Sequence, residues 1–555
     1  MKPSDPNWHS FVEAPVVVGT ADEFAWDDRA DLVVVGFGGA GAAAAIEAAS
    51  RGARVKVLER FVGGGATALS GGIIYAGGGT RQQRAAGFAD DPENMFRYLK
   101  QETGDCVSDA HLREFCESSA ANLQWLESLG LEFPGNMSPV KTSYPSNPYY
   151  LYYSGNEALP VNQEVATPAP RGHRHAARGQ AGGPFFARLR DAAVRAGVDI
   201  SYHTRVTRLV VDAQGRVVGV EAQRMDPHSR EARMHARIMK TLAPLHATAI
   251  GLMASFKPLL EKLEAKSSTR IRVRADSGVV LASGGFIVNR GMRSHYLPKY
   301  RGTLANGAPG CDGSGIRLGE SVGGATRLMD HASAWRFINP PLSFAQGVIV
   351  NARGERYCNE SAYGAQIGYR MCEQNDGVGW IVLDADGFAR ARSQAMPWKV
   401  LLFQSALSLM TMYFNSRKSD SVEGLARECG FDPAVFRETI DAYNRASRGE
   451  TPDPFRKAPE FHAEIARGPF YALNISKDSK TFPLAVISFG GLVVEERTSQ
   501  VKREDGSLVP GLYAVGRVAA GLPSNHYMSG FAIADCIFTG RKAARAAVPA
   551  QAEQK

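Results

Sequence analysis

The sequence predicts an α/β protein in which a parallel-sheet domain is interrupted by an inserted α+β domain. Three strand-then-glycine segments, at 31–60, 278–286 and 511–517, support this prediction. In each one, an apolar run typical of a buried parallel strand is next to a cluster of small residues and glycine. The length of 555 residues also exceeds one ordinary domain. We therefore expect one domain to be assembled from both ends of the chain.

The first segment, Asp31 to Arg60, reads as strand, glycine turn, helix and second strand. Gly36-x-Gly38-x-x-Gly41 directly follows a buried apolar run, and a helix of small residues follows the glycines. The second strand ends at Glu59, at the sequence separation from the glycine motif where an acidic residue hydrogen-bonds to a ribose hydroxyl. A glycine turn alone is weak evidence, but here all four features agree. They predict a Rossmann-like dinucleotide site, with the pyrophosphate at the helix N-terminus.

A second glycine cluster, at 62–72, favours FAD over NAD. It offers free backbone N–H groups and the hydroxyls of Thr67 and Ser70, which are more phosphate and ribityl contacts than NAD needs. Because the strand-then-glycine pattern recurs twice, we expect one extended FAD rather than three sites. The residues expected to contact FAD are Gly36, Gly38, Gly39, Ala40, Gly41, Glu59, Arg60, Thr67, Ala68, Ser70, Gly71, Gly72, Val206, Ala282, Gly284, Asp312, Gly516, Arg517, Gly530, Ala532 and Ile533.

Composition and charge limit the possible partners. The chain is 44% apolar and 22% charged, which is typical of a globular soluble protein. A net charge of +8 suits nucleic acid, anionic lipid or an anionic cofactor. The sequence has no nucleic-acid-binding motif, so no nucleic-acid partner is expected. The seven cysteines include no C-x-x-C pair, which argues against a metal site, an iron–sulfur site and a disulfide framework.

Nothing in the sequence predicts export or membrane insertion. The first ten residues lack the basic and apolar regions of a signal peptide. No stretch reaches the roughly 18 uninterrupted apolar residues of a spanning helix. We therefore expect a cytoplasmic protein.

Four regions are expected along the chain. An N-terminal extension covers 1–28. A Rossmann-like FAD-binding domain is split into 29–290 and 468–555, and an α+β substrate or cap domain covers 291–467. Within the first part, the alternating segment 208–224 predicts a hairpin with its turn at Gln214-Gly215.

A long insert, 226–268, separates two strands that are expected to pair. Apolar residues recur in it at helical spacing, Pro244 and Pro258 interrupt this pattern, and lysines and arginines are interleaved. One interpretation is a helical hairpin packed on the body or at an oligomer interface. The other is an amphipathic element resting on the inner face of the membrane, with peripheral contact to anionic headgroups. Since the flanking strands could rejoin through a short turn, removal of the insert is expected to spare the FAD fold.

The order of these segments, from about Asp31 to Ala547, resembles the flavoprotein family of fumarate reductase, succinate dehydrogenase flavoprotein and 3-ketosteroid dehydrogenases. In the covalent members of that family, a histidine near the second glycine cluster carries the flavin. No histidine stands between Phe61 and Thr80. The resemblance therefore implies that FAD is held noncovalently.

The carboxylate-binding residues of the fumarate and succinate members are missing here. Their "R-L-G-G-N-A-L-x-D" arginine falls on Tyr527, and their aspartate falls on Asp535. The segment 482–492 has no histidine where theirs is histidine-rich. Their catalytic arginine, which follows an "R-F-x-N-E" motif, falls within about one residue of Tyr363. A dicarboxylate substrate is therefore not expected.

Tyrosines and a serine beside a flavin suit a neutral ketone. Desaturation needs a donor for the developing enolate, a base for the α proton, and flavin N5 for the β hydride. A phenol can be the donor, or the base if its pKa falls from about 10. The helix that begins near Gly530 can stabilise the negative charge that develops.

The 3-ketosteroid dehydrogenases have such an arrangement. The Δ1 enzymes carry "Y-P-G-P-G" at this place, whereas the Δ4-(5α) enzymes look like Y-x-S-G, which here is the stretch from Tyr527 to Gly530. They also have a tyrosine after an N-E motif, which matches Tyr363. The resemblance implies Δ4-(5α)-dehydrogenation of a 3-ketosteroid in steroid degradation. Tyr527 would bind the C3 carbonyl, Tyr363 and Ser529 would take and relay the C4 proton, and C5 would give its hydride to N5.

Several alternatives remain open at this point. The chain could be a Δ1-dehydrogenase, a fumarate-reductase-like flavin enone reductase, or a nonenzymatic flavoprotein subunit that docks through its basic insert. The electron acceptor is expected to be artificial or quinone-type. Each tyrosine could be a core residue, and Ser529 could be only a helix N-cap. The tyrosine-rich loop 144–155 suits the lid of an apolar pocket.

Overall fold

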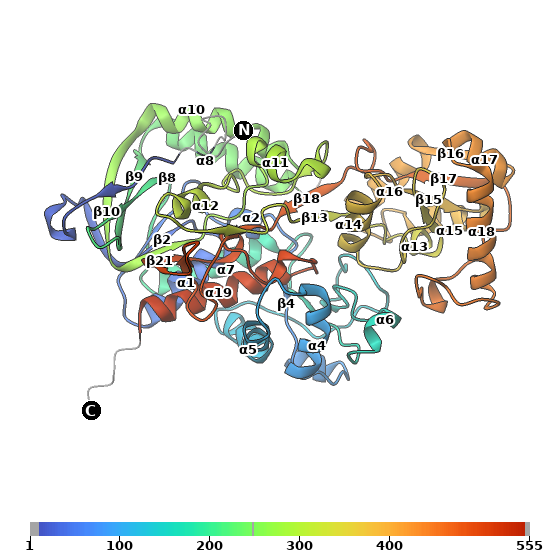
Figure 1. Ribbon diagram of the computed structural model, residues 1–555, viewed down its shortest axis with the longest axis horizontal. Helices are drawn as coiled ribbons and strands as arrows, with labels where there is room; N and C mark the ends of the chain where they lie inside the picture. Colours follow the sequence, from blue (N-terminus) through green and yellow to red (C-terminus); the bar gives the residue numbers. More distant parts are fainter. Residues whose placement is uncertain (1–9, 11, 247–248, 550–555) are drawn as a thin grey trace.

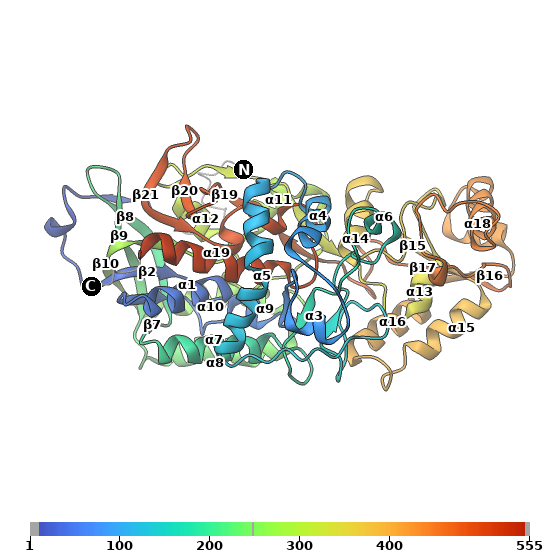
Figure 2. The same ribbon diagram turned by 90° about the horizontal axis from the view of Figure 1, so that it is seen from below.

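The computed structural model describes residues 10, 12–246 and 249–549. Figure 1 shows two lobes: a larger one that holds both ends of the chain, and a smaller one built from the middle of the sequence. The view in Figure 2, turned by 90°, shows the two lobes side by side. Mixed sheets and helices make up both lobes, so the predicted α/β class with an inserted α+β domain is confirmed.

The larger lobe is built on a sheet whose central strands run parallel. β2 (Asp28–Val35) lies between β3 (Val55–Leu58) and β10 (Ser268–Leu281), and β21 (Leu508–Ala514) pairs with β10. Helix α1 (Gly39–Ser50) connects β2 to β3, as the glycine motif predicts. These strands are rich in valine and leucine and largely buried, which is typical of a parallel sheet covered on both faces. The Rossmann-like unit is therefore present.

The long strand β10 takes part in two different pairings. Its first half pairs antiparallel with β9 (Val217–Met225), and β9 forms a hairpin with β8 (Thr204–Val211). From Val273 to Leu281 it runs parallel to β2, with a shift of register between Ala275 and Gly278. The predicted hairpin over 208–224 is confirmed, and Gly215 lies in its turn with a left-handed φ of 74°.

Two helices from distant parts of the chain pack against each other beside the sheet. α19 (Phe531–Ala547) lies along α1 (Figure 1). The approach is close, because a Cβ on Gly540 would stand 2.5 Å from the carbonyl oxygen of Ala40. A Cβ on Gly41 would stand only 2.0 Å from the carbonyl oxygen of Gly36. Both positions therefore require glycine.

Shorter elements complete the larger lobe, including a small sheet of order β4-β6-β5. Their bounds are β1 (Val16–Val17), η2 (Ala21–Glu23), α2 (Gly65–Ala68), β4 (Ile73–Tyr75), α3 (Arg81–Ala85), α4 (Pro92–Thr103), α5 (Asp109–Ser128), β5 (Leu151–Tyr152), α6 (Pro160–Gln163), β6 (Gly172–Arg174), α7 (Gly182–Arg195), β7 (Asp199–Ser201), α11 (Arg290–Tyr296), η4 (Pro298–Tyr300), α12 (Ser314–Glu320), β20 (Gln500–Lys502), η6 (Gly516–Val518) and η7 (Leu522–Ser524).

The insert between β9 and β10 is a helical hairpin, as its periodicity predicts. It begins and ends where Met225 pairs with Ser268 across the two strands. Its apolar side chains gather around Phe61 of the body, so the insert is packed on the lobe. The packed residues are Met239, Leu242, Met253 and Leu260. The helices are α8 (Arg230–Leu242), η3 (Ala243–Leu245), α9 (Leu252–Ser255) and α10 (Lys257–Ser267).

The smaller lobe, here called the cap, contains a four-stranded antiparallel sheet. Its strands, in order, are β14 (Val348–Val350), β15 (Trp380–Leu383), β17 (Phe470–Asn474) and β16 (Ser416–Ser419). Strand β17 lies beyond the boundary that the sequence places at 468. Helices surround the sheet: α13 (Leu342–Gln346), α14 (Gly364–Gln374), α15 (Ala385–Gln394), α16 (Leu402–Phe414), α17 (Val422–Cys429), α18 (Pro433–Ser447) and η5 (Pro459–Phe461).

Short strands join the two lobes. β18 (Ala485–Ser488) pairs with β13 (Ala332–Trp335) and β11 (Leu304–Ala305), and β12 (Thr326–Arg327) pairs with β19 (Gly491–Leu492). The chain thus enters and leaves the cap through adjacent strands (Figure 1). Within the described ranges, each helix is too short or too polar to cross a bilayer.

Candidate functional site

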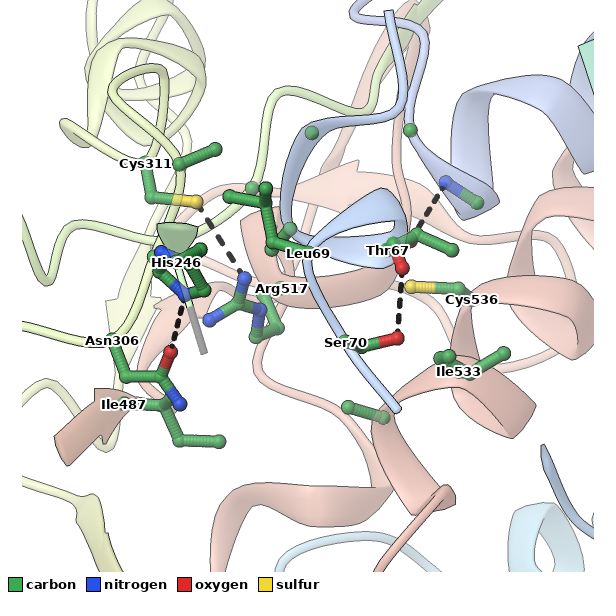
Figure 3. A pocket seen from close by; sticks show the side chains of 18 of the residues that line it. Thr67, Leu69, Ser70, His246, Asn306, Cys311, Ile487, Arg517, Ile533 and Cys536 are labelled. Atoms are coloured by element: carbon green, nitrogen blue, oxygen red, sulfur yellow. Dashed lines mark hydrogen bonds between the residues drawn. The ribbon is translucent and has the colours of Figure 1, made fainter. Parts of the chain in front are cut away.

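A cavity of about 370 Å³ extends from the ends of the parallel strands to the junction with the cap. Figure 3 shows part of it, with Thr67 and Ser70 across from His246 and Asn306. The predicted catalytic residues Tyr363, Tyr527 and Ser529 line this one cavity. So do most of the predicted cofactor residues: Gly36, Gly38, Gly39, Ala40, Glu59, Arg60, Thr67, Ser70, Gly71, Val206, Ala282, Gly284, Arg517, Gly530, Ala532 and Ile533.

Some predicted cofactor residues stand behind the cavity wall instead: Gly41, Ala68, Gly72, Asp312 and Gly516. These five residues do not line the cavity, and their contact with FAD stays a prediction. Gly41 permits α1 to approach the strand end, and a Cβ on Gly72 would stand 2.5 Å from the backbone of Ala181. Gly516 adopts a left-handed φ of 56°. Their glycines shape the wall because a side chain would push it apart.

Glu59 closes the nucleotide end of the cavity. Its two carboxylate oxygens accept hydrogen bonds of 2.7 Å from the N–H groups of Phe37 and Phe61. Burial raises the pKa of Glu59, although these two N–H groups act in the opposite direction. The acid is therefore fixed by backbone at the ends of two strands, with its remaining lone pairs free to accept from a ribose.

Arg60, next to Glu59, is the centre of a buried ion cluster. It donates to Glu264 of α10 at 2.7 Å and to Asp312 at 3.0 Å. Burial opposes charge on both acids, but Arg60 together with neighbouring groups, including Arg205, outweighs it and lowers the pKa of each. Lys257 of α10 lies 3.5 Å from the same Asp312. The insert therefore supplies part of the nucleotide end, and its removal would break the ion pair between Arg60 and Glu264. That the FAD fold survives this removal stays a prediction.

The middle of the cavity meets the N-terminus of α1. Gly38 is the N-cap and has no side chain to cap the helix, and Gly39 donates its N–H to Thr67 Oγ1 at 3.1 Å. The short helix α2 and the end of β2 approach from either side, so uncharged N–H groups surround this point. Such a helix terminus binds a pyrophosphate well, because the N–H groups and the helix dipole both favour negative charge.

Two buried polar atoms test whether a flavin fits the other end. Arg517 Nη1 and Ser283 Oγ have no hydrogen-bond partner among the described residues. Arg517 contacts Cys311 Sγ at 3.5 Å through its other terminal nitrogen (Figure 3). The N-terminus of α19 is next to it, since Gly530, Ala532 and Ile533 line the cavity. A cation and a helix N-terminus are the groups that stabilise a reduced flavin anion, so the residues fit FAD.

Tyr527 stands between two aromatic rings at the flavin end. Its ring stacks on Trp335 at 5.2 Å and on Phe489 at 5.9 Å. Burial raises the pKa of Tyr527 to about 12, while Arg517 and the Gly530 N–H act to lower it. The hydroxyl is therefore protonated at neutral pH and is a hydrogen-bond donor.

Tyr363 and Ser529 form a second hydroxyl group together with Tyr152 of β5. The Ser529 hydroxyl lies beside both phenols and acts to lower their pKa, although burial, the larger effect, raises each well above its usual value. Tyr152 Oη and Ser154 Oγ have no well-formed hydrogen bond to a described residue. The backbone orders this group, because Ser529 N–H donates to the Ser154 carbonyl and Tyr363 N–H to Asn156 Oδ1.

The structure does not support the N-cap interpretation of Ser529. The N-cap of α19 is Gly530, with a left-handed φ of 86°, and no side chain hydrogen-bonds to the first N–H groups of that helix. A Cβ on Gly530 would stand 2.7 Å from the backbone nitrogen of Tyr75. Ser529 is thus held one residue before the helix, where its hydroxyl faces the tyrosines.

Apolar side chains make up much of the remaining cavity wall, and sequence reasoning missed most of them. The wall residues come from distant segments of the junction and cap: Trp335, Phe337, Phe403, Leu407, Phe482 and Pro483. From the predicted lid 144–155, Tyr144 lines the cavity, and its hydroxyl donates to the Gly71 carbonyl at 2.9 Å. Tyr152 is the other residue missed, and its place in the same tyrosine-rich loop is the signal that could have found it.

Comparison with known proteins agrees with this geometry. Residues 31–530 match the family model described as "FAD binding domain". The chain is 41% identical over 508 residues to 3-oxo-5-alpha-steroid 4-dehydrogenase of Comamonas testosteroni, covering 90% of this chain and 94% of the relative. The chain belongs to this FAD-binding flavoprotein family. FAD is accordingly its cofactor, and the protein is an FAD-dependent oxidoreductase.

Two further members of the family define its neighbourhood. The crystal structure of 3-ketosteroid-Δ4-(5α)-dehydrogenase from Rhodococcus jostii RHA1, solved with 4-androstene-3,17-dione, matches with a TM-score of 0.81 and 29% identity. That match covers 97% of this chain and all of the other. The 3-oxosteroid 1-dehydrogenase of Mycolicibacterium smegmatis is 26% identical and covers 90% of this chain and 93% of the relative. The resemblance to flavin-dependent ketosteroid dehydrogenases is confirmed.

Proposed function

We propose that this flavoprotein introduces the C4–C5 double bond into a 3-keto-5α-steroid. The observation that carries the proposal is one cavity lined by Tyr527, Tyr363 and Ser529, with the buried Tyr152 beside Ser529 behind the wall. The steroid relatives named above support the substrate class. Bound FAD supplies a two-electron acceptor whose N5 takes the hydride from C5.

Tyr527 is the donor to the C3 oxygen. Its pKa of about 12 keeps the phenol protonated across the physiological range, so it can donate to a ketone and more strongly to an enolate. The stacking on Trp335 holds the ring in one orientation, so little reorganisation is needed as charge develops.

Tyr363 and Ser529 remove the C4 proton as a relay. Burial keeps both neighbouring phenols protonated, so neither is a ready phenolate base. A proton can still leave the substrate if the accepting hydroxyl passes its own proton onward in the same step. Ser529 lies beside both Tyr363 and Tyr152, so each hydroxyl can accept one proton and pass on its own, and the proton given up by the last hydroxyl leaves to water.

The charge of the cavity disfavours a carboxylate substrate. Arg336 lines the wall, but its guanidinium donates to the carbonyl oxygens of Phe482 and Ser476. A carboxylate would therefore compete with bonds that this buried arginine already makes. The neutral ketone needs only the hydroxyl of Tyr527. This favours the dehydrogenase over a fumarate-reductase-like enone reductase.

The proposal extends to the electron acceptor and the location. We assign a quinone-type acceptor, or an artificial one in assays, because a flavin reduced by the steroid must be reoxidised for turnover. We place the protein in the cytoplasm with a peripheral contact at the inner face of the membrane. The sequence suggests the insert 226–268 for this contact, and its exposed apolar side chains are Met234, Leu245, Leu252 and Leu259. A more extensive apolar surface on the cap, described below, is the better candidate.

The decisive experiment is anaerobic titration of the oxidised holoenzyme. A 5α-3-ketosteroid should bleach the flavin and yield the Δ4-3-ketosteroid, whereas the matching Δ4-3-ketosteroid should bind without bleaching it. Bleaching by the Δ4-3-ketosteroid with formation of a 1,4-diene would establish the Δ1 alternative. The absence of bleaching by either compound would overturn the steroid assignment.

A further inference from the structure

One face of α16 in the cap is apolar and open to water. Trp398, just before the helix, is 78% exposed, and Phe414 at its end is 80% exposed. Between them, exposed residues recur every four positions or so along one side. We call this set the α16 surface: Trp398, Leu402, Ala406, Met410, Tyr413 and Phe414. Contiguous exposed apolar side chains of this size mark an interaction site.

The opposite face of the same helix lines the cavity. Phe403, Gln404, Leu407 and Ser408 are cavity-wall residues and alternate with the exposed ones at helical spacing. The helix therefore separates the cavity from whatever covers the α16 surface, and only its own thickness, about 10 Å, lies between them. Figure 2 shows α15 and α16 along the lower edge of the cap.

Cations predominate along the chain around the α16 surface, although Asp386 of α15 and Asp420 are also exposed. The stretch 395–419 contains no aspartate or glutamate, but includes Lys399, Arg417 and Lys418, which are exposed. Arg390 and Arg392 of the adjacent α15 are exposed as well. Apolar side chains bordered by cations suit a surface that is anionic outside and apolar within.

We propose that the α16 surface docks on an anionic phospholipid bilayer. Tryptophan and tyrosine favour the headgroup level, leucine, methionine and phenylalanine enter the acyl boundary, and the lysines and arginines meet phosphate groups. A second copy of the chain fits less well, because a symmetric contact would bring the same cations together from both copies. The inference rests on the proposed function for its purpose: a steroid dissolved in the bilayer would face the helix that walls the cavity.

The test compares two matched pairs of substitutions in the full-length holoenzyme. The first variant is Leu402→Ser with Phe414→Ser on the α16 surface. The control is Met234→Ser with Leu259→Ser, two exposed apolar residues of the insert. None of these four side chains lines the cavity. Unchanged FAD content and melting temperature show that each variant is folded.

Sedimentation is measured with phosphatidylcholine vesicles and with vesicles that also contain phosphatidylglycerol. We expect the wild type to bind the anionic vesicles and the α16 variant to bind them about tenfold or more weakly. The insert variant should bind within about threefold of the wild type. Lys399→Gln with Lys418→Gln should weaken binding to anionic vesicles but not the weak binding to phosphatidylcholine, and high salt should imitate it.

Three results would overturn the proposal. The first is wild-type protein that binds no vesicle. The second is an insert variant that loses vesicle binding while the α16 variant binds as the wild type does, which would assign the contact to 226–268. The third is a wild-type protein that is dimeric by analytical ultracentrifugation and an α16 variant that is monomeric. Turnover of detergent-solubilised steroid is measured separately, so failure of the proposed function is distinguishable from failure of docking.

Discussion

Replacing Tyr527 by phenylalanine tests the proposed donor most directly. The ring lies between Trp335 and Phe489 at 5.2 and 5.9 Å, and phenylalanine keeps both stacking contacts. The substitution therefore removes a hydroxyl without emptying the site. Because the pKa of Tyr527 is raised to about 12, the group removed is a protonated donor at every pH below about 10.

The size of the effect follows from what that hydroxyl does. Removal of one preorganised donor to a developing oxyanion costs about 10²–10³ in rate, or about 2.7–4 kcal/mol. We therefore expect flavin reduction in Tyr527→Phe to slow by that factor, with little change in steroid affinity, because the hydrogen bond strengthens mainly in the transition state. The loss should be the same from pH 6 to about pH 9, since the donor does not titrate there.

The assay is anaerobic stopped-flow reduction of the flavin by a 5α-3-ketosteroid at saturating concentration. FAD content and the flavin spectrum serve as controls for an intact site. Reduction within about threefold of the wild-type rate would refute the assignment of Tyr527 as donor. A loss that grows with pH would refute the reasoning about its protonation.

Other predictions follow from the same geometry. Tyr363→Phe and Ser529→Ala should keep FAD and lose about 10²–10⁴ in flavin reduction, and a near-wild-type rate in Ser529→Ala would remove that residue from the relay. Acid precipitation should release the flavin into the supernatant, whereas flavin retained by the polypeptide would contradict noncovalent binding. Glu264→Gln should weaken FAD binding in fluorescence titration, because buried Arg60 loses one ion pair, and unchanged affinity would show that the insert does not support the nucleotide end. Burial opposes charge on Glu360, but Arg356 and Lys457 lower its pKa from 4.5 to about 2. The ionised Glu360 therefore contributes fully to the stability of the cap above about pH 5, and this contribution is lost as the pH falls from about 5 to about 2. In Glu360→Gln, the melting temperature should depend less on pH over this range.

Local patterns predicted the nucleotide half of the site well. The turn from Gly36 to Gly41 combines a strand end, a tight turn and a helix N-terminus within a few residues. The residues that determine this part of the site are therefore adjacent in the sequence. Tyr527 and Ser529 came from the resemblance, which gave their place relative to a terminal helix. The contact of Asp312 with FAD stays a prediction, and what the sequence did not indicate is its ion pair with Arg60, which joins residues far apart in the chain.

The steroid half could not be predicted in the same way. Its walls combine Trp335, Phe403 and Phe482, which are brought together only by pairing between strands of the junction and packing of the cap. No local pattern records such long-range contacts. The periodicity of the insert predicted two helices correctly, but not that Glu264 would reach Arg60 across the fold. Helical periodicity shows on which face of a helix a charged side chain lies, but not which residues of the fold that face contacts.

The packing of α19 against α1 has a consequence for how the protein is made. Gly36 and Ile533 line one cavity but are separated by almost the whole chain. On the ribosome, β2, α1 and β3 emerge early, whereas the helix that covers α1 follows only after the cap has been synthesised. Until then, the small-residue face of α1 is uncovered and the site for FAD lacks its flavin end. The cap can fold as a unit in the meantime, so it is complete before the domain that surrounds it. Cofactor capture is thus among the last events of biosynthesis, and slow arrival of α19 would leave an apolar surface exposed to chaperones and to aggregation.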